Sequence, residues 1–171
     1  ITTFIATLAL TVFLSPEIYG IFFLVSSVVN FLTYFSDIGL AAALIQKKSQ
    51  VTKEDLVTTF TVQQLLVISL LLILYIATPS ISSFYSFTPE GIKLMYALAI
   101  SLFLSSLKTI PSVLLERKLR FNKLIIPQIA ETLVFNFVAV YLAWKGYGIT
   151  SFTIAVLARG VTGLVLMYIV S

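Results

Sequence analysis

Two long stretches without a charged residue constrain this chain more than any other feature. Ile18 to Phe35 is 18 residues long and Leu56 to Thr78 is 23. At 1.5 Å per residue, a helix over the shorter stretch spans about 27 Å, close to the hydrocarbon thickness of a bilayer. The whole chain is 59% hydrophobic and only 11% charged, too apolar for the surface of a soluble domain of this size. The sequence therefore predicts an all-α, polytopic transmembrane helical bundle.

Six apolar segments predict about six membrane helices within a single domain, 1–171. They cover roughly 1–14, 18–45, 53–78, 90–115, 124–145 and 149–171. Thr52 with Asp55 is a capping-box pattern, and Thr88 followed by Pro89 is typical of a helix start. The first segment is too short to cross a bilayer, no secretory signal precedes it, and no helix-ending signal follows the last. We therefore expect the domain to be incomplete at both ends.

The basic residues indicate which way the chain crosses the membrane. Seven lie in or beside the second and fourth loops: Lys47, Lys48, Lys53, Arg117, Lys118, Arg120 and Lys123. The remaining loops have only Lys93 and Lys145 nearby. By the positive-inside rule, the two basic loops and the amino terminus are cytoplasmic. The formal charge of +4 is explained in this way, so no nucleic-acid partner is expected.

The composition also restricts the chemistry. The chain has no Cys and no His, which removes thiol nucleophiles, imidazole bases and the usual zinc, copper and haem ligands. We expect no cofactor, no metal and no catalytic site. A membrane-embedded glycosyltransferase or polymerase would need large loops that carry catalytic residues, and the longest loop expected here is only about a dozen residues.

Polar residues recur at helical spacing within the apolar segments. Ser26, Asn30, Thr33 and Asp37 share one helix face, as do Ser101, Ser105, Lys108 and Ser112, and Gln128, Glu131, Thr132 and Asn136 form a broader stripe. We expect the helix faces that carry these polar residues to be directed to the bundle interior. The alternative for the hydroxyl residues is that they only bond to backbone or to neighbouring helices as packing contacts.

Three charged residues at membrane depth are the strongest site candidates: Lys108, Glu131 and Arg159. An ionised side chain there costs about 2.5 to 3.5 kcal/mol, so it should face water or the bundle interior. Lys108 is near the end of its helix, and snorkelling to the surface is an equal alternative; Asp37 could likewise be an interfacial feature. Pro111 predicts either a kink or the end of the membrane helix, followed by a surface-lying amphipathic segment.

Several stretches carry a family resemblance. The matching stretches are Phe35 to Leu40, Ala43 to Lys48 and Thr52 to Leu56, with Leu14 to Gly20 and Ile110 to Phe121 in support. They resemble polysaccharide exporters of the oligosaccharide flippase type, in the superfamily that also holds the MATE drug antiporters. The chain is shorter than members of that family, so it corresponds to an amino-terminal portion and would form one lobe of a MOP/MATE-like transporter.

The resemblance implies a function. It implies a transporter in the bacterial inner membrane that flips an undecaprenyl-pyrophosphate-linked oligosaccharide by alternating access, for O-antigen or exopolysaccharide assembly. Its partners would be the lipid-linked oligosaccharide, membrane lipid and the carboxy-terminal lobe of the same protein. The alternative is a MATE-type antiporter that couples drug exit to cation entry through a buried carboxylate such as Glu131 or Asp37.

Arg159 and Glu131 are the sharpest site hypothesis. They lie at similar depths on antiparallel helices, so a direct pair is geometrically possible. A guanidinium keeps its charge in a low-dielectric region and binds phosphate oxygens through paired donors. We therefore expect Arg159 to face phosphate, with Glu131 as its partner and Asn30, Asp37, Lys108 and Gln128 as further cavity residues. An ion pair that only fastens two helices has equal weight.

Overall fold

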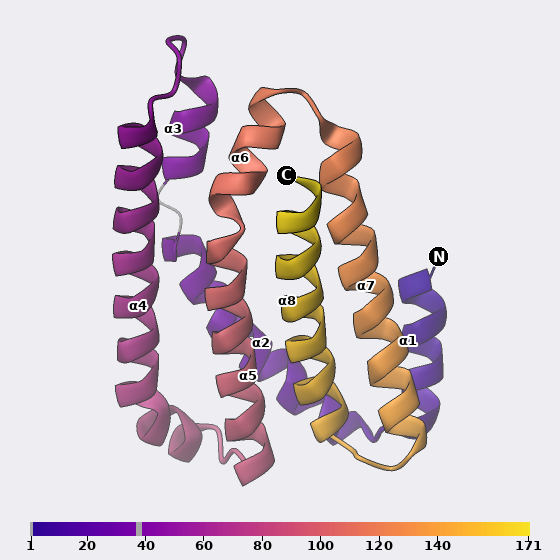
Figure 1. Cartoon of the computed structure of the whole chain (residues 1–171). Helices are drawn as coiled ribbons and strands as arrows, with labels where there is room; N and C mark the ends of the chain where they lie inside the picture. The colour runs from indigo at the N-terminus through magenta and orange to yellow at the C-terminus, as the bar shows by residue number, and fades with distance from the viewer. Residues whose placement is uncertain (1, 37–38) are drawn as a thin grey trace.

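The computed structural model describes residues 2–36 and 39–171, which form eight helices (Figure 1). Their bounds are α1 Thr2–Phe13, α2 Pro16–Ser36, α3 Leu40–Gln46, α4 Lys53–Phe84, α5 Pro89–Leu107, α6 Thr109–Arg117, α7 Phe121–Trp144 and α8 Thr150–Val170. The long helices run up and down the bundle, and α8 packs along both α5 and α7.

Five of these helices, α2, α4, α5, α7 and α8, are long and apolar enough to cross a membrane. The predicted all-α membrane bundle is therefore confirmed. α1 has 12 residues, about 18 Å of helix, and is too short to cross a bilayer.

Two segments that we expected to be single helices are each divided. The segment 18–45 contains α2 and α3, and Asp37, between them, lies outside the described residues. The segment 90–115 is divided at Lys108 into α5 and α6. Pro111 explains this second break, because it has no N–H to donate to the Leu107 carbonyl four residues earlier. Pro111, Val113 and Leu115 are buried, so α6 is packed into the bundle rather than lying on its surface.

A third boundary also differs from the prediction. We expected a loop from Pro79 to Thr88, but α4 continues to Phe84. A proline removes a single helical hydrogen bond, and serine hydroxyls in the next turn bond to nearby carbonyls: Ser82 to Pro79 at 3.0 Å and Ser83 to Ser80 at 3.1 Å. The predicted helix starts are present, since Thr52 and Asp55 form a reciprocal capping box and Thr88 accepts from the Gly91 N–H.

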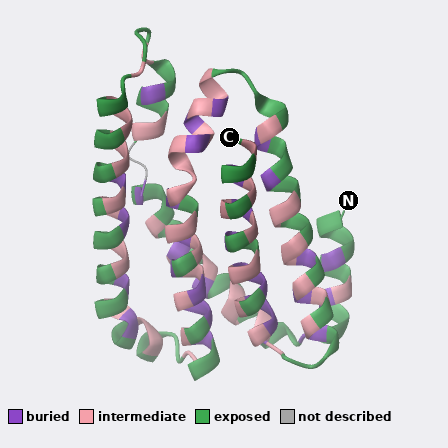
Figure 2. Ribbon diagram, in the orientation of Figure 1, coloured by how far each residue is buried: buried purple, intermediate pink, exposed green. Residues whose placement is uncertain are grey.

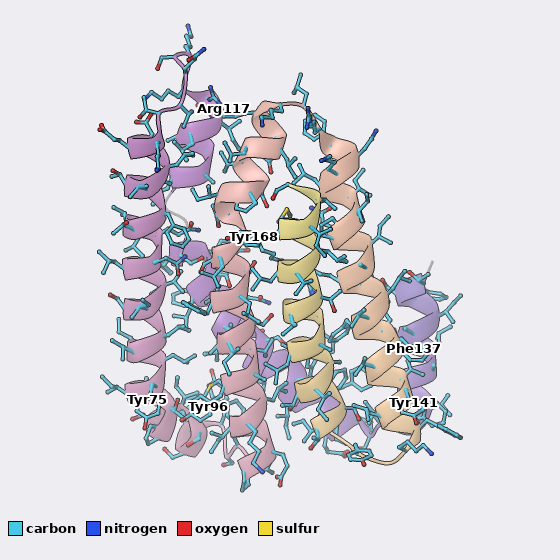
Figure 3. All side chains as sticks on the ribbon, in the orientation of Figure 1. Tyr75, Tyr96, Arg117, Phe137, Tyr141 and Tyr168 are labelled. Carbon is cyan, nitrogen blue, oxygen red and sulfur yellow. The ribbon has the colours of Figure 1, made fainter. Side chains whose placement is uncertain are left out.

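The two basic loops lie at one end of the bundle, where several contacts fasten α3. Lys47 forms an ion pair with Asp55 at 2.6 Å. The Arg117 guanidinium, at the end of α6 (Figure 3), donates to the carbonyl of Ile45 (3.1 Å) in the last turn of α3 and to those of Lys47 (2.9 Å) and Ser49 (3.2 Å) beyond it. Because these carbonyls lack helical partners, a cation is well placed to satisfy them. The basic end is therefore tied together by Arg117.

The main hydrophobic core lies at the opposite end of the bundle (Figure 2). It is made by residues of α1, α2, α4, α5, α7 and α8, and it extends to the middle of the bundle at Val29 and Leu102. Leu94, Met95 and Phe152 are essentially inaccessible. Phe22 stacks on Phe152 with ring centroids 4.1 Å apart. At this end α7 and α8 are joined by a tight turn, in which Gly146 and Gly148 adopt positive φ angles. One end is thus packed, and the polar residues collect in the other half.

Candidate functional site

A part-buried ion pair joins the α5–α6 break to α7. The Lys108 ammonium contacts Glu131 Oε1, and the two side chains are only 14% and 12% exposed. Lys108 therefore does not snorkel to the surface, because a carboxylate inside the bundle balances its charge. When one partner of such a pair is lost, the fold is destabilised, because the remaining charge has little contact with water and no counter-charge.

Arg159 on α8 is the third member of the cluster. Its Nε lies 3.6 Å from Glu131 Oε2, so the carboxylate has one cation near each oxygen. The Arg159 side chain is 54% exposed, and its two terminal nitrogens have no hydrogen-bond partner among the described residues. We call Lys108, Glu131 and Arg159 the charged triad. Within it, Lys108 is the buried partner of the carboxylate and Arg159 offers free donors.

Gly163 makes room for the triad. A Cβ at this position would lie 2.7 Å from Glu131 Cγ and would overlap the carboxylate itself. The Glu131 side chain therefore crosses α8 directly over the glycine, and any larger residue would displace it. We did not single out Gly163 from the sequence, although a glycine within a membrane helix is a signal for close approach.

The residues on both sides of Lys108 are held by other helices. The Tyr168 hydroxyl on α8 points to the α5–α6 junction (Figure 3) and donates at 3.1 Å to the Leu107 carbonyl, the group that Pro111 leaves without its helical partner. Gln63 on α4 donates to Thr109 Oγ1 at 2.9 Å. The break therefore has a defined geometry. Two adjacent glutamines, 63 and 64, within an uncharged stretch are the sequence feature that could have indicated this contact of α4.

Two adjoining cavities surround the triad and share Ser105, Lys108, Glu131 and Arg159. One, of about 480 Å³, extends to α3 and α6 and includes Gln128. The other, of about 210 Å³, extends to α2 and includes Asn30 and Thr33. The structure thus brings five of the predicted site residues to one hollow region: Asn30, Lys108, Gln128, Glu131 and Arg159.

The lining of these cavities indicates what they can bind. Where they overlap, the described residues supply two cations and one carboxylate, a formal charge of +1. Glu116 also lines the larger cavity, away from this overlap, and brings that cavity to a formal charge of zero. The side-chain amides of Asn30 and Gln128 have no hydrogen-bond partner among the described residues, and such groups can bond to hydroxyls. Within the described part of the chain, no group of three or more acidic side chains could hold a metal ion. The arrangement suits an anionic ligand with many hydroxyl groups.

Comparison with known proteins supplies the family. Neither a curated protein nor a solved structure matches the chain. A family model described as "Polysaccharide biosynthesis protein" matches residues 9–171, nearly the whole length. Since this match extends from α1 through α8 and includes every member of the charged triad, the chain belongs to the polysaccharide biosynthesis protein family.

Proposed function

We propose that the chain is the membrane-embedded part of a flippase for undecaprenyl-pyrophosphate-linked oligosaccharide. It would act in the bacterial inner membrane, moving the repeat unit to the outer leaflet for O-antigen or exopolysaccharide assembly. Alternating access would involve the carboxy-terminal lobe of the same protein. The observation that carries this proposal is a half-exposed Arg159 in a polar cavity, within an apolar bundle of the polysaccharide biosynthesis family.

The triad geometry suits a pyrophosphate. Glu131 lies beside Nε of Arg159, so the edge formed by the two terminal nitrogens remains available for two phosphate oxygens. Lys108 keeps the carboxylate in place from the buried side. The amides of Asn30 and Gln128 line the adjoining space, where hydroxyls of the first sugar could bond to them. The substrate is thereby recognised by its charge and its hydroxyls.

A MATE-type drug antiporter is less compatible with this site. In the smaller cavity a cationic drug would meet a formal charge of +1 and the exposed guanidinium of Arg159. The carboxylate that would attract the drug, Glu131, already has one cation near each oxygen. The geometry therefore favours the anionic substrate.

Replacing Arg159 with lysine tests the proposal. Arg159→Lys keeps the charge beside Glu131 but removes the paired donors, so we expect at least a tenfold loss of polymer export at normal protein level. Arg120→Lys is the matched control, because Arg120 is exposed in the loop before α7 and lines neither cavity. Export by the Arg159→Lys variant equal to that of the control would show that the guanidinium does not bind phosphate.

The proposed orientation has its own test. We expect the basic end of the bundle to be cytoplasmic, because seven basic residues lie there. The chain has no native Cys, so single cysteines at Ser49, in the α3–α4 loop, and Ser86, in the α4–α5 loop, can be probed from outside with an impermeant thiol reagent. Labelling at 86 with protection at 49 is the expected pattern, and the opposite pattern would reverse the topology.

A further inference from the structure

A second hollow lies on the other side of α6 from the polar cavities. It is a groove of about 470 Å³ between α4, α6 and α8, near the basic end. Its apolar walls come from three helices: Leu56, Val57 and Phe60 on α4, Ile110 and Leu114 on α6, and Tyr168 on α8. Its volume is in the range of ordinary ligand pockets. An apolar groove of this size takes part of a molecule rather than a single ion or water.

α6 separates this groove from the polar cavity. Thr109, Ser112 and Glu116 line the cavity, whereas Ile110, Leu114 and Lys118 line the groove, as expected for opposite faces of one helix. The short helix is therefore two-sided, with one face toward each compartment.

The wall between the two compartments is closed. The Tyr168 hydroxyl is bonded to the Leu107 carbonyl at 3.1 Å, and Ser112 Oγ lies 3.8 Å from Met167 Sδ. Leu115 and Met167 belong to one buried cluster on the same seam. A molecule whose phosphate is bound at Arg159 cannot reach the groove through this wall. The groove is therefore a compartment separate from the cavity at Arg159.

One cation marks the end of the groove. Lys118 is exposed beyond α6, and its ammonium has no hydrogen bond or ion pair within residues 2–36 and 39–171. Phe60 lies seven residues after Lys53, about 10 Å deeper along α4. The groove thus runs from the level of lipid headgroups into the hydrocarbon region. A ligand that matches this groove would have a long apolar chain and a negative charge at one end.

We propose that this groove is a binding site for an anionic phospholipid, with an acyl chain between α4, α6 and α8 and the headgroup phosphate at Lys118. A basic residue at the membrane surface favours an anionic lipid by a factor of about five in affinity. The bound chain would fill the space beside the α5–α6 break and hold α6 against its neighbours. The lipid is a resident component of the fold, distinct from the substrate.

The experiment measures how anionic lipid stabilises the full-length protein. Protein purified in detergent is titrated with phosphatidylglycerol or with phosphatidylcholine, and the rise in Tm is followed. We expect phosphatidylglycerol to raise Tm at lower concentration than phosphatidylcholine. Lys118→Gln should raise the half-saturating concentration of phosphatidylglycerol about fivefold and leave that of phosphatidylcholine unchanged. Leu114→Trp, which fills the groove, should abolish the effect of both lipids.

Lys48→Gln is the matched control, since Lys48 lies in the other basic loop and does not line the groove. An equal shift for Lys48→Gln and Lys118→Gln would mean that only surface charge is sensed, and the site would be withdrawn. Normal lipid response of Leu114→Trp would also overturn it. A polyprenyl phosphate that displaces phosphatidylglycerol at lower concentration would assign the groove to an isoprenoid chain instead.

Discussion

Glu131→Gln is expected to destabilise the protein by about 1 to 3 kcal/mol, less than for a fully buried pair because the triad lines two cavities. The reason is that Lys108 would stay buried without its carboxylate, and Arg159 would lose its one ion-pair partner among the described residues. The shape of the side chain is conserved, so the change reports charge rather than packing. Thermal unfolding of the purified protein measures it, as a fall in Tm.

Two further variants make this result specific. Adding Lys108→Met to Glu131→Gln removes the unpaired buried charge, so the double variant should recover most of the lost stability. Glu54→Gln is the control, because Glu54 is exposed in the first turn of α4 and belongs to no ion pair in the described chain. If Glu131→Gln were as well tolerated as Glu54→Gln, the triad would contribute nothing to the fold.

Gly163→Ala is expected to disable the site without changing any charge. The new methyl group would occupy the position of the Glu131 carboxylate, which would be forced away from Lys108 and Arg159. We expect a loss of polymer export, because the carboxylate no longer holds Arg159 in place, together with lower thermal stability. This loss should occur although alanine favours a helix by about 1 kcal/mol over glycine.

Gly20→Ala is the matched control, because a Cβ at position 20, within α2, would meet no atom within 4 Å. That variant should export normally and be unchanged or slightly more stable. The same outcome for Gly163→Ala would show that Glu131 has free space elsewhere, and the tight crossing over α8 would not matter for function. Comparing the two variants therefore separates a steric effect at the triad from a general effect of helix propensity.

Local signals in the sequence were sufficient for much of the fold. Apolar length predicted the membrane bundle, and the Thr52 and Thr88 caps were visible because capping depends on residues only three positions apart. Depth along two antiparallel helices was enough to anticipate a Glu131–Arg159 pair. These features depend on spacing along the chain, which a single sequence contains in full.

Contacts between distant helices could not be predicted in this way. Spacing alone left Lys108 equally suited to the surface, because the carboxylate that holds it is 23 residues away on another helix. The roles of Gly163 and Gln63 depend on which faces of α7, α8, α4 and α5 meet. The sequence predicts a helix end at Pro79, but a proline removes only one helical hydrogen bond and α4 continues to Phe84. Tertiary packing decided the other cases.

The tight glycine turn between α7 and α8 has a consequence for how the protein enters the bilayer. Glu131 and Arg159 would each cost about 2.5 to 3.5 kcal/mol if their helices were inserted separately into lipid. Only residues 145–149 join the two helices, so α7 and α8 are antiparallel neighbours from their first contact. The opposite charges can then pair before either helix is surrounded by hydrocarbon. We therefore expect the two helices to be integrated together, as one hairpin, during biosynthesis.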